Sequence, residues 1–363
     1  MTAGGTAGLP PAPSHGGRRL AFPDALRGLA ALWVVLFHFG AGRQLSQLQA
    51  ALPDALDRAI FGAGHFGVPI FFVLSGFVIA LSIGDDAVDA GYVGRFALRR
   101  AIRLDLPYWG AIAIGVAALE FKRAVTGAAN VPTVTVGQVV AHMFYLQEFL
   151  GLPGINPVFW TLTNEVQFYL LFCILLGLAH TLRRAPEDRR SQHALFALAA
   201  VAAVAWPLVR WLHVRGLAMA NWHGFLLGAF VAWSLSGTMR TRWFAAFAAA
   251  MTGVWVLTGD SFTLVCVLTA TGMLLVGRAG HLGDWCDTAP LQFLGRVSYS
   301  LYLLHVPVSG AAFHVLRPLL AGTAARELLA MVLVLAVNLA VAQLFWWGVE
   351  RPSTALARRL RKR

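Results

Sequence analysis

Two residues that could bind an anion and transfer a proton lie inside the first apolar run of the chain. Arg27 and His38 are separated by ten residues within the segment Leu26–Phe39. An ionisable side chain inside a membrane-spanning segment costs free energy, so its presence there indicates a function. At about 1.5 Å per residue of helix, the two side chains would be roughly 16 Å apart along the axis. This separation suits a long substrate with a phosphate-bearing head at Arg27 and a reactive end at His38.

The composition of the whole chain is that of a membrane protein. Hydrophobic residues make up 58% of the 363 residues and charged residues 13%, whereas soluble domains are about 45–50% apolar and about 25% charged. The net charge is +12, and the basic residues lie between the apolar runs. This distribution predicts cytoplasmic loops beside anionic membrane lipids, and it argues against a nucleic-acid partner. The three cysteines, Cys173, Cys266 and Cys286, show no metal-ligand spacing, so we expect neither a metal site nor a disulfide framework.

Apolar runs that could cross a membrane recur along the chain and predict an all-α, polytopic protein with about ten transmembrane helices. The segment Val136–Leu152 contains His142, Gln147 and Glu148, and we expect it to lie at the membrane surface instead. After the first run, the expected spans are 64–83, 104–121, 157–180, 194–212, 221–236, 243–259, 261–277, 294–314 and 327–348.

The positions of the arginines predict the orientation. With Val136–Leu152 left out of the count, the arginine clusters all fall on the side of the N-terminus, which places both termini in the cytoplasm. Residues 1–19 are expected to be a disordered cytoplasmic tail, residues 20–352 the transmembrane domain and residues 353–363 a basic cytoplasmic tail. The clusters are Arg95 with Arg99, Arg100 and Arg103; Arg183–Arg190; Arg240 with Arg242; and Arg358–Arg363.

This orientation brings Glu165 into the same half of the membrane as His38. The fourth expected span begins at the outer face near Trp160, and Glu165 would lie about 7–9 Å further into the membrane. A carboxylate within hydrogen-bonding distance would orient the imidazole of His38 and raise its basicity. We therefore predict that His38 and Glu165 form a catalytic pair.

Several segments, in this order along the chain, resemble the bacterial integral-membrane acyltransferases called acyltransferase family 3. The resemblance covers about residues 20–352. It includes an Arg-x10-His spacing, an Arg-x3-Arg motif and a Trp-Ser-Leu-Ser-x-Glu-like segment. The matching segments are Phe22–His38, Gly67–Phe77, Arg99–Arg103, Trp160–Tyr169, Leu294–His305 and Val349–Pro352.

Two positions depart from the family pattern. The proline that usually follows the Arg-x3-Arg motif by three residues comes one residue later, at Pro107, which leaves the start of the third span open. Val166 follows Glu165 where many members carry a second acid, so Glu165 is the only carboxylate at that place. No esterase-like extension follows the last expected span, so acceptor handling would need a separate extracytoplasmic partner protein.

The resemblance implies an acyltransferase in the bacterial cytoplasmic (inner) membrane. Such an enzyme moves an acyl group, here expected to be acetyl, from cytoplasmic acyl-CoA to a hydroxyl of a saccharide or glycoside, and acyl-CoA is a co-substrate and not a bound cofactor. His38 would act as base or acyl relay together with Glu165. Arg27, Arg99 and Arg103 would bind the phosphates of CoA, because guanidinium groups pair with phosphate bidentately. Further residues that could line the cavity are Ser75, Trp160, Tyr169, Tyr299, Ser300 and His305.

Each of these residues also has a purely structural interpretation. The arginines of the Arg-x3-Arg motif could be topology signals, His38 could bond a neighbouring helix, and Glu165 could be an interfacial acid. His305 precedes Pro307 and could fill a kink, and Ser75 could allow close helix packing. A transporter or exporter is the alternative function. We find no internal repeat of the kind many transporters have, and the few intramembrane charges cluster near two spans.

Overall fold

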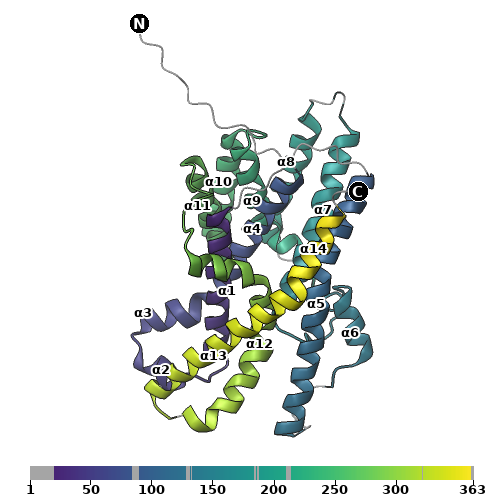
Figure 1. The fold of residues 1–363 in the computed structure, drawn as a ribbon. Helices are drawn as coiled ribbons and strands as arrows, with labels where there is room; N and C mark the ends of the chain where they lie inside the picture. The colour runs from purple at the N-terminus through teal and green to yellow at the C-terminus, as the bar shows by residue number, and fades with distance from the viewer. Residues whose placement is uncertain are drawn as a thin grey trace.

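The computed structural model describes residues 20–83, 90–127, 131, 133–183, 185, 188–209, 214–320 and 322–360, which form helices and no strand (Figure 1). The all-α prediction is confirmed. The expected tail 1–19 and residues 361–363 lie outside the described residues, as does part of the cluster Arg183–Arg190. The long helices are α1 (Ala21–Ala41), α4 (Gly67–Ile83), α5 (Ala90–Thr126), α7 (Trp160–Thr181), α8 (Arg190–Ala205), α9 (Trp222–Leu235), α10 (Thr241–Thr258), α11 (Ser261–Arg278), α12 (Ala289–Leu320) and α13 (Ala324–Phe345).

Shorter helices connect or extend the long ones. A turn of π-helix joins α13 to the last helix, so the chain continues in helical form to Arg359. The α-helical ones are α2 (Ser46–Ala51), α3 (Asp54–Asp57), α6 (Val136–Met143) and α14 (Arg351–Arg359), and the 3₁₀ and π turns are Arg58–Gly62, Ala63–Phe66, Trp206–Leu208, Ala218–Asn221 and Trp346–Glu350.

Eight helical segments of the described chain are long and apolar enough to cross a membrane, compared with the ten expected. The two expected spans that are not among them, 221–236 and 243–259, correspond to α9 and α10. Helix α9 has only 14 residues and lies enclosed by α4, α10 and α11, whereas a span needs about 20 residues. The eight segments are Ala21–Ala41, Asp54–Ile83, Gly91–Thr126, Trp160–Thr181, Arg190–Leu208, Ser261–Arg278, Ala289–Pro318 and Ala324–Arg359.

Glycines allow the helices that carry the site to approach closely. A Cβ atom at Gly28 of α1 would collide with the backbone of Leu294 and Gly295 on α12, and one at Gly295 would collide with the backbone of Asp24. This pair of small residues brings the backbones of α1 and α12 into contact. The arginine and histidine of α1 therefore lie against α12, which is far away in the sequence.

Helix α5 begins fourteen residues before the span expected at 104–121, and Pro107 lies inside it. Its 37 residues correspond to about 55 Å, longer than the roughly 30 Å thickness of the hydrocarbon core. The delayed proline therefore does not start the helix. Since Arg99, Arg100 and Arg103 all belong to α5, their side chains occupy fixed positions around its axis.

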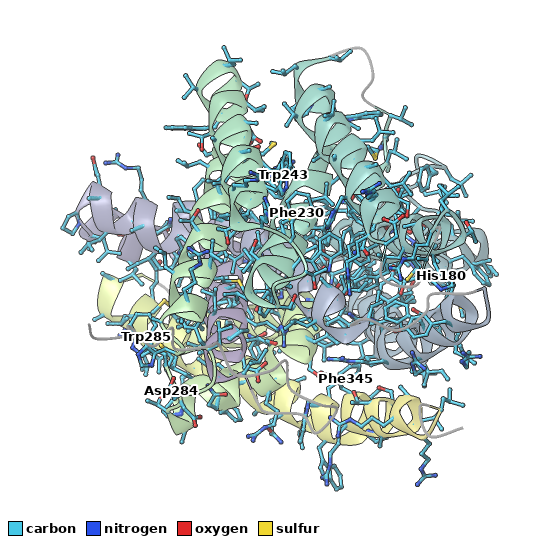
Figure 2. The ribbon with its side chains drawn as sticks, turned by 90° about the horizontal axis from the view of Figure 1, so that it is seen from above. His180, Phe230, Trp243, Asp284, Trp285 and Phe345 are labelled. Carbon is cyan, nitrogen blue, oxygen red and sulfur yellow. The ribbon has the colours of Figure 1, made fainter. Side chains whose placement is uncertain are left out.

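An aromatic core holds α4, α7 and α9 together. The rings of Phe72 and Phe168 stack on the ring of Phe225, at centroid distances of 4.4 and 4.3 Å. Figure 2 shows Phe230 among the side chains in the interior of the bundle, while Asp284 and Trp285 lie at its edge. The stack fixes the rotation of α7 and hence the direction of its polar residues.

The segment Val136–Leu152 contains a single short helix and is not a span, because α6 has only eight residues. Its buried side includes His142, whose Nδ1 lies 2.7 Å from the carbonyl oxygen of Gln138 and whose Nε2 accepts a hydrogen bond from the backbone N–H of Ile155. Burial lowers the pKa of His142 below its ordinary value of 6.5, so the ring is neutral and Nε2 can accept. The location of this segment at the membrane surface stays a prediction.

Candidate active site

A cavity of about 750 Å³ is lined by the first turns of α1 and by α14, together with residues of α4, α5, α7 and α12. Its volume is typical of a small-molecule site. The charged side chains around it are predominantly basic, and we call it the arginine cavity. They comprise six arginines and three acids, namely Arg27, Arg100, Arg103, Arg296, Arg351, Arg358, Asp24, Glu165 and Glu350.

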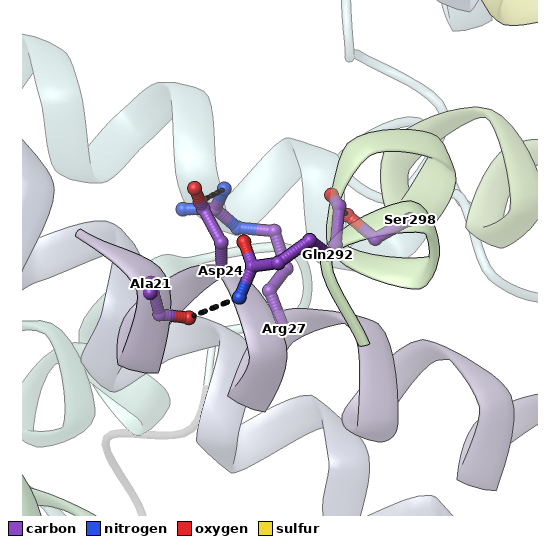
Figure 3. Close-up of polar contacts among 6 residues, drawn as sticks. Ala21, Asp24, Arg27, Gln292 and Ser298 are labelled. Atoms are coloured by element: carbon purple, nitrogen blue, oxygen red, sulfur yellow. Dashed lines mark hydrogen bonds and ion pairs between the residues drawn. The ribbon is translucent and has the colours of Figure 1, made fainter. Parts of the chain in front are cut away.

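Two of the three arginines expected to bind an anion line the arginine cavity. Arg27 is held by an ion pair with Asp24, at 3.2 Å between Nη1 and Oδ1 (Figure 3). Arg103 faces the cavity from α5. Arg99 does not line the cavity, since its guanidinium lies over the ring of Tyr92 at 5.9 Å. Arg100 lines it instead, and the expected motif therefore contributes a different pair of arginines.

The start of α1 is fixed to α12 beside the arginine cavity. The side-chain Nε2 of Gln292 donates a 2.9 Å hydrogen bond to the backbone oxygen of Ala21, and this bond is visible beside the Asp24–Arg27 pair in Figure 3. Gln292 and Ser298 of α12 both line the cavity with Arg27. The contact therefore sets the position of Arg27 relative to α12.

Glu165 also belongs to the arginine cavity. Its carboxylate accepts hydrogen bonds from the hydroxyl of Ser75, at 2.7 Å, and from the hydroxyl of Tyr169. The guanidinium of Arg100 lies 4.3 Å from the centre of the Tyr169 ring. The prediction that Glu165 pairs with His38 is wrong, because Glu165 bonds Ser75 and Tyr169 and lines the arginine cavity, whereas His38 lines a different cavity.

The partner of His38 is His305. Nε2 of His305 lies 3.1 Å from Nδ1 of His38, and the two rings meet edge to face. Nδ1 of His305 lies 2.8 Å from the backbone oxygen of Tyr302, and Nδ1 of His38 lies 2.9 Å from that of Val34. In each neutral ring Nδ1 therefore carries the proton, because a carbonyl oxygen can only accept. Nε2 of His38 is left unprotonated and can act as a base.

His38 lines a second, smaller cavity of about 300 Å³, which we call the histidine cavity. Its other walls are largely aromatic and aliphatic and include Trp160, as expected, together with Phe262 and His65. Val68 and Tyr302 line both cavities and therefore stand between them. The hydroxyl oxygen of Tyr302 lies 2.9 Å from Oγ1 of Thr161, which holds the ring in this position.

Of the other residues expected to line a cavity, three line the arginine cavity and two lie behind the cavity walls. Ser75, Tyr169 and Tyr299 line the arginine cavity. Ser300 and His305 are fully buried and line neither cavity. Ser300 donates a hydrogen bond of 2.5 Å to Glu350, which faces the arginine cavity. Ser300 and His305 therefore support Glu350 and His38, which do line the cavities.

Sequence reasoning did not find several lining residues. These residues include Arg100, Arg296, Glu350, Arg351, Arg358, His65 and Phe262. The match of Val349–Pro352 to the family pattern could have indicated Glu350 and Arg351, which both lie in this segment. Arg358 lay in a run of basic residues that resembled an ordinary cytoplasmic tail.

Comparison with known proteins identifies the family. A family model described as an acyltransferase domain matches residues 20–347. The chain is 28% identical over 336 residues to a protein of Komagataeibacter xylinus named as a membrane-bound transacylase, BcsY, covering 86% of this chain and 79% of that protein. It is also 28% identical over 136 residues to nodulation protein 10 of Rhizobium leguminosarum bv. viciae, covering 33% of this chain and 35% of that protein. No solved structure matches the chain.

The family match covers most of the chain, with all residues that line the histidine cavity and those of the arginine cavity up to Trp346. It assigns the protein to the enzymes and sets aside the transporter alternative. The chain belongs to the acyltransferase 3 family and is a multi-pass membrane acyltransferase.

Proposed function

We propose that the protein transfers an acyl group, most simply acetyl, from cytoplasmic acyl-CoA to a hydroxyl of a saccharide or glycoside presented from the other side of the bacterial inner membrane. The observation that carries the proposal is the arrangement of the two cavities. Arginines line one of them, His38 with its bonded partner His305 lines the other, and both share Val68 and Tyr302. A phosphate-bearing acyl donor fits the first cavity, and a hydroxyl acceptor fits the second.

Both termini would be cytoplasmic in this arrangement. The first turns of α1 and the residues of α14 border the same cavity, so the two ends of the described chain lie on one side of the bundle. CoA is a cytoplasmic metabolite and is too polar to cross the bilayer. The arginine cavity would therefore open to the cytoplasm and the histidine cavity toward the opposite face.

The chemistry would proceed by general-base catalysis. Nε2 of His38 removes the proton of the acceptor hydroxyl as its oxygen attacks the thioester carbonyl carbon. The tetrahedral intermediate collapses, the carbon–sulfur bond breaks, and the departing CoA sulfur takes the proton back from His38. The product is an ester and free CoA. His305 positions the imidazole of His38 through its hydrogen bond to Nδ1 and touches neither substrate in this scheme.

The walls of the histidine cavity support a saccharide acceptor. Phe37, Trp160 and Phe262 present aromatic surface there, and aromatic rings offer both an apolar face and a polar edge to a ligand. The less polar face of a sugar ring can pack on such surface while one of its hydroxyls points at His38.

The function is tested by mass spectrometry of surface glycans and secreted glycosides from cells with and without the protein. We expect species that are heavier by one acyl group only when the protein is present. With the purified protein in nanodiscs, which leave both faces accessible, CoA release from acetyl-CoA should then depend on addition of the acceptor identified in this way. Identical glycan and glycoside masses in the two strains would contradict the proposal.

Arg103 and Arg99 form a matched pair for testing the site of the acyl donor, since both lie on α5. Arg103→Ala is expected to raise the apparent KM for acetyl-CoA by roughly 10–150-fold, the effect of losing one charge-assisted phosphate contact of about 1.5–3 kcal/mol. Arg99→Ala should change this KM by less than about threefold, because its side chain packs on Tyr92 outside the cavity. Equal effects of the two substitutions would mean that overall positive charge matters and not a contact at Arg103.

A further inference from the structure

The last described helix, α14, forms one wall of the arginine cavity, and its arginines have no part in the chemistry above. Ser353 and Ala357 are buried, and α14 packs against α5, where the hydroxyl of Ser353 donates to the backbone oxygen of Arg103. Arg351, Thr354 and Arg358 line the cavity. Spacings of three, four and seven residues place these side chains on one face of a helix. The helix thus has one face packed on the bundle and one turned to the cavity.

The cavity-facing arginines of α14 are available to an anion. No acidic side chain of the described residues forms an ion pair with Arg351 or Arg358, whereas Arg27, deeper along α1, is paired with Asp24. Arg351 and Arg296 of α12 both lie over the ring of Trp346, at 5.8 and 5.3 Å. Two arginines therefore meet at one aromatic ring of the cavity, and Arg358, which is exposed, lines the same cavity two turns further along α14.

We propose that Arg358, together with Arg351, binds the 3′-phosphate on the ribose of acyl-CoA, so that the enzyme selects CoA thioesters over acyl donors without that phosphate. This inference rests on the proposed function, which supplies the acyl donor. Once the thioester is directed toward Val68 and Tyr302, the adenosine end of CoA must point to the opposite end of the cavity.

The order of the arginines along the cavity follows the order of the phosphates in CoA. Arg100 lies over the ring of Tyr169, which bonds Glu165, and Glu165 interacts electrostatically with Tyr302 of the shared wall. Arg100 and Arg103, one turn apart on α5, therefore suit the diphosphate. Helix α14 begins next to Glu350 and ends at Arg359, and Arg358 lies about 10 Å beyond Arg351 along its axis. The 3′-phosphate is the anionic group of CoA farthest from the thioester, and Arg358 is the cavity arginine nearest the chain end.

Anionic lipid headgroups share the phosphate chemistry of this ligand and could also approach arginines at a membrane surface. The test therefore uses the purified full-length protein in nanodiscs of phosphatidylcholine alone, with acetyl-CoA and 3′-dephospho-acetyl-CoA as competing acyl donors. The variants are Arg358→Ala, Arg358→Lys and, as a matched control, Arg359→Ala, whose side chain is adjacent on the same helix but does not line the cavity.

The wild-type protein is expected to prefer acetyl-CoA over its 3′-dephospho form by roughly tenfold in kcat/KM. Arg358→Ala should raise the KM for acetyl-CoA by about 5–20-fold and leave that for the dephospho form unchanged, so the preference falls to near one. Arg358→Lys should keep part of the preference, because an ammonium retains the charge without the fork. Arg359→Ala should keep the full preference.

Three results would overturn the inference while leaving the proposed function intact. They are an equal rise in both KM values with Arg358→Ala, an unchanged preference in that variant, and a loss that appears only when phosphatidylglycerol is added to the nanodiscs. The last result would assign Arg358 to a lipid headgroup. If the wild-type protein used neither CoA thioester with any acceptor, the proposed function would fail and this inference with it.

Discussion

Replacing His38 by alanine is expected to lower the rate of acyl transfer by a factor of about 100–10,000, the usual effect of removing a general base. His38 lines the histidine cavity, its Nε2 carries no proton when both rings are neutral, and no other described residue of that cavity has a second histidine bonded to its ring. The protein should still insert and accumulate, because the side chain is half-buried and its loss removes little packing. The measurement is the initial rate of ester formation with purified variant protein.

His65→Ala is the matched control for His38→Ala. His65 lines the same cavity, but its Nδ1 lies 2.9 Å from the backbone oxygen of Gly62 and no second histidine supports it. We expect less than a tenfold loss of rate for this variant. Retention of more than about a tenth of the wild-type rate by folded His38→Ala protein would remove the base role from His38.

The sequence predicts a depth for His38 in the membrane, but it did not predict the partner of this residue. Depth follows from the helical rise and from the side on which a span begins, and both can be read from the chain. Lateral neighbours depend on which helices pack together. Here Gly28 and Gly295 bring α1 against α12, so His38 meets His305 and not Glu165, and a single sequence does not reveal such a pairing of distant glycines.

The arginines on α5 show a second limit of the sequence. The Arg-x3-Arg spacing pointed to Arg99 and Arg103, whereas the face of α5 that lines the cavity carries Arg100 and Arg103. The direction of that face is set by contacts with α7, α12 and α14, which come later in the chain. Periodicity identifies which residues share a face, but packing decides which face meets the cavity.

Two of the ten expected spans are not among the eight candidate segments, and one of them, α9, shows a third limit of the sequence. Helix α9 is as apolar as a membrane span, but its apolar side chains pack on α4, α10 and α11 inside the protein. Gly76 and Gly228 allow this contact, since a Cβ at either would collide with the backbone of the other helix. High hydropathy indicates that a segment is shielded from water. It does not show whether lipid or other parts of the protein surround the segment.

His305→Ala is expected to lower kcat by about 10–100-fold with little change in the KM for acetyl-CoA. His305 accepts a hydrogen bond from Nδ1 of His38, and its loss would free the imidazole to rotate away from the acceptor hydroxyl. His305→Gln should recover part of the rate, because the side-chain oxygen of glutamine can accept the same bond. A merely space-filling role for His305 would predict no such rescue.

A double-mutant cycle separates this pair from Glu165. His38→Ala with His305→Ala should be hardly slower than His38→Ala alone, because His305 acts only through the missing ring. Glu165→Gln should instead multiply its effect with that of His38→Ala and act mainly on the KM for acetyl-CoA, because Glu165 faces the arginine cavity with Ser75 and Tyr169. Multiplicative losses for the two histidines, measured as kcat in folded protein, would show that His305 does not work through His38 and would leave the 3.1 Å contact without a role in catalysis.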